Sequence, residues 1–368
     1  MQLRGLTLQN FRNIESLSLR AENGINVVLG SNAQGKTNLL ESIFFLSCVR
    51  SFHARKESEL VQFTFPDATI CADVFSHQRE FQIKINLSAT KKRQIFVNGI
   101  KQTKLLNYVG LVQTVLFSPD DLNLMRNGPS ARRRFINIAL SQLKPRYLQT
   151  LSQYQKVLEE KNKLLKQPVF YGELDTLLDV YNERLATLGA SIISYRAAFL
   201  EKLAAHAQEI HKEMSQTKET FSAIYQTDRY VENPCGDIKE IETALYRHFC
   251  ERKVAECESR MCLIGPHRDD LDCLINSVSV RQFASQGQTR TAVLALKLAE
   301  RNLFFEANGE YPILLLDDVL SELDETRQDF VLNQITNGQV FITSCEPSAK
   351  KLVHTGKVFT MKQGFLSE

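Results

Sequence analysis

Residues 30 to 37, Gly-Ser-Asn-Ala-Gln-Gly-Lys-Thr, constrain the fold of this chain more than any other stretch. They match the phosphate-binding pattern G-x-x-x-x-G-K-[ST] at every fixed position. The two glycines permit turns in which consecutive backbone N–H groups face a phosphate, while Lys36 supplies a cation and Thr37 a hydroxyl for Mg²⁺. The flanks agree, because residues 25 to 29 predict a buried strand and residues 38 to 46 predict a helix whose positive end faces the anion. The candidate nucleotide-binding residues are Gly30, Ser31, Asn32, Ala33, Gln34, Gly35, Lys36, Thr37 and Asn38.

Length and composition indicate an ordinary globular protein with room for two domains, or for one large domain with an insertion. The chain has 368 residues, 43% hydrophobic and 24% charged, and a net charge of only +3. The N-terminus lacks a basic and apolar signal segment, and the longest uncharged apolar run, residues 43 to 49, is too short to cross a bilayer. The eight cysteines form no C-x-x-C pair, which suits reduced thiols. We therefore expect a cytoplasmic protein without a membrane partner.

Alternating residues around the phosphate loop predict an antiparallel flap. Two short alternating stretches, Leu6 to Leu8 and Leu17 to Leu19, precede the loop, and three more strand candidates lie at 68–75, 81–87 and 93–97. The last ends at Asn98-Gly99, a strong hairpin signal.

The character of the chain changes after residue 124. Between residues 122 and 166 there are ten basic residues and two acidic ones, and apolar residues at helical spacing follow from Leu177 to Leu203. Residues 125–259 are therefore predicted to form an inserted helical arm, with a break near Pro168 and Gly172. The basic run leaves two interpretations open, contact with nucleic-acid phosphates or a solvated helix face.

Two later segments add candidate chemistry. Ser285, Gln286, Gly287 and Gln288 precede a strong helix former, which makes them either a second anion site or an ordinary helix cap. The apolar run from Ile313 ends in two carboxylates, as a central parallel strand would at a ligand-binding sheet edge. We expect Asp317 to hold Mg²⁺ and Asp318 to orient a water, the alternative being a strand end with a helix cap.

Taken in order, these motifs resemble the ABC-type ATPase heads of the SMC class, and within it a family of bacterial recombination mediators. The resemblance spans nearly the whole chain and rests on residues 10–13, 30–37, 117–122, 132–135, 265–271, 285–290 and 316–324. It implies an α/β fold, a P-loop ATPase head with a mixed sheet and antiparallel flap, formed by residues 1–124 and 260–368 around the helical arm at 125–259. Residues 265–270 would be a structural hinge where the chain re-enters the ATPase head.

The resemblance also implies a mechanism. ATP with Mg²⁺ would bridge a homodimer, with Ser285, Gly287 and Gln288 of one subunit reaching the γ-phosphate held by the other, Arg12 near the base and Asp324 at the subunit contact. Proteins of this family bind duplex DNA beside single-stranded gaps and act with RecR, RecO and RecA. The candidate DNA contacts are Arg132, Arg133, Arg134, Lys144 and Arg146.

Two departures from the general ABC pattern predict slow hydrolysis. Asp318 stands where Glu is usual, and Thr343-Ser-Cys345 occupies the place of the switch histidine. We therefore expect a timed switch with weak ATPase activity. A transporter energy subunit is the main alternative, opposed by the long basic insertion, and a small-molecule kinase is a further one.

Overall fold

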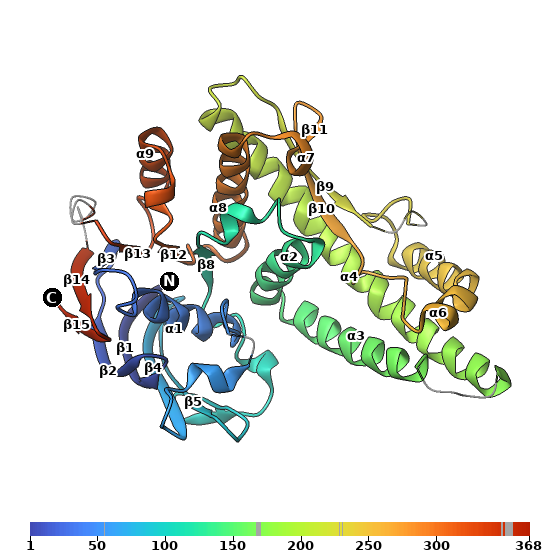
Figure 1. Cartoon of the computed structure of the whole chain (residues 1–368), viewed down its shortest axis with the longest axis horizontal. Coiled ribbons are helices and arrows are strands. Elements are labelled where there is room, and N and C mark those ends of the chain that lie inside the picture. Colours follow the sequence, from blue (N-terminus) through green and yellow to red (C-terminus); the bar gives the residue numbers. More distant parts are fainter. Residues whose placement is uncertain (55, 167–170, 228, 230, 347–348, 350–355) are drawn as a thin grey trace. The chain divides into compact units, whose positions relative to one another are not determined.

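The computed structural model describes residues 1–54, 56–166, 171–227, 229, 231–346, 349 and 356–368. These residues divide into two compact units (Figure 1). Unit 1 comprises residues 1–123, 213–217 and 293–368, and unit 2 comprises 124–212 and 218–292. The predicted start of the arm at residue 125 is one residue from this division. The predicted arm ends at residue 259, whereas unit 2 also includes residues 260–292.

Unit 1 holds a mixed, mostly parallel sheet that carries the phosphate loop. Its strands, in spatial order, are β15 (Phe365–Ser367), β14 (Gly356–Lys362), β3 (Ile25–Leu29), β13 (Val340–Ser344), β12 (Ile313–Asp317) and β8 (Thr114–Phe117). All neighbours pair in parallel except β14 and β15. The central strands β12 and β13 are buried along their lengths, as continuous apolar runs require when both faces of a sheet are covered. Helix α1 (Lys36–Cys48) packs against β8, β12 and β13.

The second sheet of unit 1 is the predicted antiparallel flap. Its order is β2 (Ile14–Arg20), β1 (Gln2–Phe11), β4 (Asp67–Ser76), β5 (Arg79–Ser88), β6 (Gln94–Val97) and β7 (Ile100–Gln102). Buried and exposed residues alternate along β4, so one face packs inward and the other meets solvent. The β6–β7 hairpin turns at Asn98 and Gly99, which both have positive φ, as a two-residue turn of this type needs. Helix α9 (Glu325–Gln334) follows β12 in the chain.

Unit 2 combines long helices with a small sheet. Its helices are α2 (Pro129–Leu143), α3 (Pro145–Leu164), α4 (Tyr171–Met214), α5 (Ile238–Glu251), α6 (Lys253–Ser259) and α7 (Val280–Phe283), and helix α8 (Gln286–Asn308) begins in it. The predicted break at Pro168 lies outside the described residues. The sheet, absent from the sequence-based prediction, has the order β11 (Val278–Ser279), β10 (Asp270–Ile275) and β9 (Phe221–Gln226).

The predicted hinge at 265–270 belongs to unit 2. It leads into strand β10, which pairs with β9 of the same unit. Six residue pairs join these strands in antiparallel register, from Asp270 opposite Gln226 to Ile275 opposite Phe221. Just before β10, Asp269 is buried and faces Arg196 of α4 at 3.5 Å. The segment therefore anchors the helices of unit 2 through buried ion pairs.

Candidate nucleotide-binding site

The phosphate loop connects β3 to α1 with the conformation that its two glycines allow. Gly35 has φ +108°, and an added Cβ there would lie 2.8 Å from Asn13 Oδ1. At Gly30 an added Cβ would meet the Met361 carbonyl oxygen at 2.4 Å. Both positions thus need glycine, and α1 begins directly after the second one. The first backbone N–H groups of α1 have no partner within the helix, so they are available to an anion bound in the loop.

Lys36 lies folded over this loop. Its Nζ donates to the carbonyl oxygens of Gly30 at 2.7 Å and Ser31 at 3.1 Å, and it lies 3.1 Å from Cys345 Sγ. The side chain is only 5% exposed, yet Asp318 Oδ2, its ion-pair partner among the described residues, is 3.8 Å away. A nearly buried ammonium bonded chiefly to carbonyl oxygens keeps most of its charge for an anion that enters the loop.

Thr37 and Asp317 form the oxygen cluster that the sequence predicts for Mg²⁺. Thr37 Oγ1 donates to Asp317 Oδ1 at 3.1 Å, and Thr343 Oγ1 donates to the same oxygen at 2.8 Å. Thr343 is the register partner of Asp317 in the parallel pair β12–β13, so the sheet itself brings them together. Burial raises the pKa of Asp317 despite these two hydrogen bonds. A hard divalent cation fits this set, because it prefers oxygen ligands and would stabilise the buried carboxylate.

Asp318 turns its carboxylate toward the loop. Its backbone has φ +53°, a left-handed conformation that aspartate tolerates better than most residues, and its N–H donates to Thr343 Oγ1 at 2.9 Å. Asp318 Oδ2 accepts from Cys345 Sγ at 3.5 Å, and the same thiol donates to Asn32 Oδ1 at 2.9 Å. Cys345 therefore occupies the space between the loop and Asp318.

A hairpin that the sequence-based prediction missed supports the loop from the side. The β14–β15 turn places Gln363 and Gly364 against Gln34, whose Oε1 and backbone O accept their N–H groups at 2.6 and 2.9 Å. Asn38 Nδ2 donates to Asn13 Oδ1 at 2.7 Å, and Asn13 lies in the turn between β1 and β2. The alternation of Phe359-Thr-Met-Lys362 followed by Gln363-Gly364 is the sequence signal that could have predicted this hairpin.

Arg12 has partners of its own. Its guanidinium forms a bidentate ion pair with buried Glu41, at 2.8 Å for both bonds, and donates to the Glu59 carbonyl at 3.0 Å. The hydrogen bonds to Glu41 raise the pKa of Arg12 against the effect of burial. The structure gives Arg12 a packing role beside α1, and its contact with a nucleotide base stays a prediction.

The segment 285–288 lies in unit 2, where it opens helix α8. Ser285 Oγ accepts from Gln288 N at 3.2 Å, and Gln288 Oε1 accepts from Ser285 N at 2.9 Å, which is a capping box. Gln288 Nε2 also donates to Glu219 Oε1 at 2.8 Å. Gln286 and Gly287 are the first residues of the helix. The cap alone explains Ser285, whereas a trans contact of these residues with nucleotide stays a prediction.

Asp324 caps helix α9. Its carboxylate accepts from Arg327 N at 3.0 Å and pairs with the Arg327 side chain. The predicted subunit contact of Asp324 is compatible with this position, because the carboxylate is 52% exposed.

The candidate DNA contacts have different surroundings. Arg132 is 2% exposed, forms a bidentate pair with Asp270 at 2.7 and 2.8 Å, and donates to three carbonyls, among them Met125 at 3.1 Å. The structure therefore gives Arg132 a role within the fold, because its guanidinium is buried and paired with Asp270, and its contact with DNA is not favoured. Arg134, Lys144 and Arg146 are exposed, and Arg133 is half-buried.

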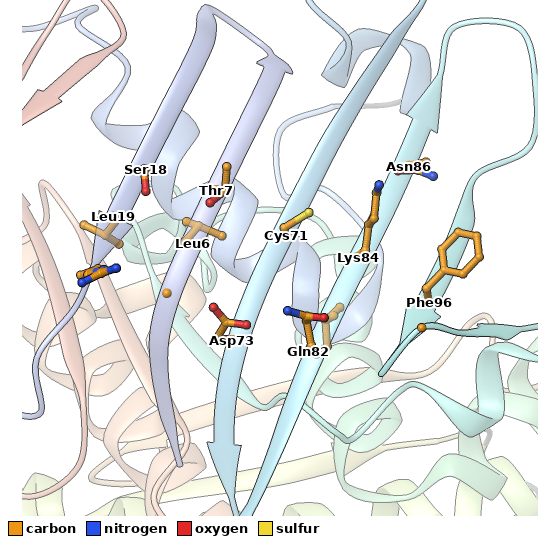
Figure 2. Close-up of a pocket in the computed structure, with 14 residues that line it drawn as sticks. Leu6, Thr7, Ser18, Leu19, Cys71, Asp73, Gln82, Lys84, Asn86 and Phe96 are labelled. Carbon is orange, nitrogen blue, oxygen red and sulfur yellow. The ribbon is translucent and has the colours of Figure 1, made fainter.

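A separate hollow of about 620 Å³ lies on the solvent-facing side of the antiparallel flap (Figure 2). Thr7, Cys71 and Lys84 cross it in one row on β1, β4 and β5, with Asp73 and Gln82 in the next row. None of the phosphate-loop residues, Asp317 or Asp318 lines it. This hollow is thus distinct from the site that carries the predicted chemistry.

Phosphate loop, acidic strand end and antiparallel flap together define an ABC-type ATPase head of the SMC class. The family description "RecF/RecN/SMC N terminal domain" matches residues 2–366. Similar proteins include the DNA replication and repair protein RecF of Pediococcus pentosaceus, 41% identical over 100% of this chain and 99% of that protein, and that of Lactobacillus johnsonii, 40% identical with the same coverage. The chain belongs to the RecF family, which confirms the resemblance inferred from its motifs.

Solved structures agree with this assignment. The recombination mediator protein RecF, described with ATPrS in the RecFOR pathway, is 35% identical with a TM-score of 0.92, over 100% of this chain and 97% of that one. An Smc head bound to the C-winged helix domain of ScpA matches at a TM-score of 0.57 and 15% identity, over 100% of this chain and 96% of that one, so it supports the fold alone. Among the described residues, no helix is long and apolar enough to cross a membrane.

Proposed function

We propose that this chain is an ATP-switched DNA-binding protein of replication and recombinational repair. The arrangement of Lys36, Thr37, Asp317 and Asp318 at one sheet edge is the observation that carries the proposal. Full-length similarity to RecF proteins whose structures are described with ATP supports it. The transporter alternative is not favoured, since both the sequence relatives and the structures with high identity are RecF proteins.

Each residue of the site has a distinct task in this proposal. The loop N–H groups and Lys36 bind the β- and γ-phosphates, and Thr37 with Asp317 holds Mg²⁺. Bound Mg²⁺ would neutralise phosphate charge where it develops during transfer. Asp318, one methylene shorter than glutamate, orients a water and accepts its proton less effectively, so hydrolysis is slow.

The switch itself depends on a homodimer. Segment 285–288 of one protomer would contact the γ-phosphate held by the partner, so that the dimer persists only while that phosphate is present. Exposed Asp324 would lie at the same subunit contact. Arg133, Arg134, Lys144 and Arg146 would contact DNA phosphates next to single-stranded gaps, and RecR, with RecO and RecA, would act in the same pathway.

DNA binding in three nucleotide states tests this proposal. Fluorescence anisotropy with gapped duplex DNA is measured with ATP, with ADP and without nucleotide, each at two salt concentrations. We expect tight binding only with ATP, weakening as salt rises because phosphate contacts release counterions. Binding that is the same in all three states would contradict the switch, and absence of binding in every state would contradict the DNA-binding function.

A further inference from the structure

A hollow of about 440 Å³ in unit 2 has a lining that lacks carboxylates. It lies between the start of α2, Asn162 of α3 and residues 261 to 268. Arg133 and Arg268 both line it, together with Ser130, Asn162 and His267. It thus joins two motifs, 132–135 and 265–271, that the nucleotide site does not use.

Backbone carbonyls, not carboxylates, hold the two guanidinium groups. Arg133 Nη1 donates to the Asp269 carbonyl at 2.7 Å, and Arg268 Nη2 donates to the Cys262 carbonyl at 3.4 Å. Within the part of the chain that the structure describes, neither arginine has a carboxylate at ion-pair distance. Burial, followed by the positive charge of Arg196, lowers the pKa of Arg133. Carbonyl bonds fix the direction of each guanidinium without neutralising it, so the hollow keeps an excess of positive charge.

The remaining polar groups of the hollow are donors. Asn162 Oδ1 already accepts from Cys262 N at 2.7 Å, which leaves its side-chain NH₂ as the unused group. Ser130 lies in the first turn of the 15-residue helix α2, a turn that contains no acidic residue. The positive end of that helix adds to the field of the arginines.

His267 completes the wall as a neutral ring. Its Nδ1 accepts from the Tyr154 hydroxyl at 2.7 Å, and Nε2–H donates to the Cys262 carbonyl at 3.2 Å. Gly265 permits this arrangement, because a Cβ there would lie 2.4 Å from the Tyr154 oxygen. The ring therefore positions the 265–268 turn and brings Arg268 to the hollow.

We propose that this hollow binds one phosphate of the DNA backbone, through Arg133, Arg268, Asn162 and Ser130. A lining of donors, with two guanidinium groups that have no carboxylate at ion-pair distance in the described residues, matches the oxygen atoms of a phosphodiester. The inference rests on the proposed DNA-binding function and makes it specific. It keeps Arg133 from the predicted set and adds Arg268, Asn162 and Ser130.

Salt-dependent binding to gapped duplex DNA at saturating ATP tests the site. For the double variant Arg133→Gln with Arg268→Gln we expect about tenfold weaker DNA binding. The negative slope of log K against log salt should become less steep by about one. The single variants should be non-additive, because both side chains contact the same phosphate. Arg247→Gln, a change at an exposed arginine of α5, is the matched control and should leave the slope unchanged.

Ser130→Asp separates binding from folding. An aspartate in the first turn of α2 favours the helix, so the melting temperature should not fall. The added carboxylate should repel a phosphate and weaken DNA binding by roughly tenfold.

Each outcome has a defined meaning. If the wild type binds DNA and all of these variants bind with the same affinity and slope, the phosphate site is wrong while the proposed function stands. If the wild type binds no DNA in any nucleotide state, both are wrong. Calorimetric titration with inorganic phosphate distinguishes the source of the anion. Loss of that binding in the double variant with unchanged DNA affinity would show a site for a small phosphate, and would overturn the DNA assignment.

Discussion

The nucleotide site of unit 1 and the ion cluster of unit 2 use similar residues in opposite ways. In unit 1, nearly buried Lys36 is bonded to carbonyl oxygens, and the carboxylate oxygen of its ion-pair partner is 3.8 Å away. In unit 2, Arg132 is bidentate to Asp270, and Arg196 bonds to Pro266 O, Asn137 and Tyr147. Lys36 is bonded to neutral oxygens and keeps its net charge for a ligand, whereas a carboxylate at hydrogen-bond distance neutralises Arg132. The charge of the partners distinguishes function from stability here.

The largest expected effect breaks the cluster of unit 2. Arg132→Leu leaves the Asp270 carboxylate without its main partner in a site where Arg132 is 2% exposed. Arg281 Nη1 stays 3.5 Å from Asp270, so the carboxylate keeps a weaker partner, and we expect unit 2 to lose about 3 kcal/mol of stability, measured by denaturant unfolding. Arg146→Leu, at an exposed position, serves as control and should stay within about 0.5 kcal/mol. Equal stability of the two variants would show that the ion pair contributes nothing.

The reciprocal change removes charge from unit 1. Lys36→Ala should weaken ATP binding by about a hundredfold, since charge-assisted bonds to phosphate are lost. Light scattering should then show no ATP-induced dimer. The melting temperature of the Lys36→Ala variant should stay close to that of the wild type, because Asp318 Oδ2 lies 3.8 Å from Lys36 Nζ, beyond hydrogen-bond distance. Lys84→Ala, on the solvent-facing side of the flap (Figure 2), is the control. An unchanged ATP-induced mass for Lys36→Ala would contradict the role of the lysine.

A third change separates binding from chemistry within unit 1. Asp318→Asn keeps the shape of the side chain and removes only its ability to accept a proton. We expect ATP to bind with similar affinity and the hydrolysis rate to fall by about tenfold. Single-turnover phosphate release measures the rate, and equilibrium binding of ATP is the control. A variant unable to bind ATP would show that Asp318 holds the nucleotide instead.

The smallest expected effect concerns pH and unit 2. Burial lowers the pKa of His267 to about 4, below its ordinary value of 6.5. Between these values the unfolded chain binds a proton that the folded chain does not, so stability falls as the pH falls. From pH 6.5 to 5.5 this loss is about 1 kcal/mol, and it should be absent in His267→Gln. Unfolding at both pH values measures the difference, and the same pH dependence in both proteins would exclude His267 as its source.

Much of unit 1 could be predicted because its signals are local. The phosphate loop, the run ending at Asp317 and the turn at Asn98-Gly99 each require particular residues at fixed spacing. Predicted strands at 25–29, 68–75 and 81–87 correspond to β3, β4 and β5. The β14–β15 hairpin, which holds Gln34 of the loop, was missed because its alternating stretch, Phe359 to Lys362, is only four residues long.

Unit 2 was predicted less completely. Helical periodicity indicated its long helices. The small sheet depends on the pairing of β9 with β10, a strand more than forty residues away, and this pairing keeps residues beyond 259 in unit 2, which ends at Ala292. Arg132, Arg133 and Arg134 are adjacent in the sequence and look equivalent there. In the structure one is buried in an ion pair, one lines a hollow and one is exposed.

The sequence by itself indicated the class of this protein and its family, and it predicted a phosphate loop and an acidic strand end, because these motifs depend on backbone geometry and residue chemistry over a few positions. Only the tertiary structure decided which charges have partners. Ion pairs such as Arg132–Asp270 join residues 138 positions apart, and a one-dimensional pattern cannot show whether a guanidinium faces a carboxylate, a carbonyl or solvent. The group that an arginine faces sets the cost of burying its charge. It therefore decides whether the arginine stabilises the fold or remains available to a phosphate.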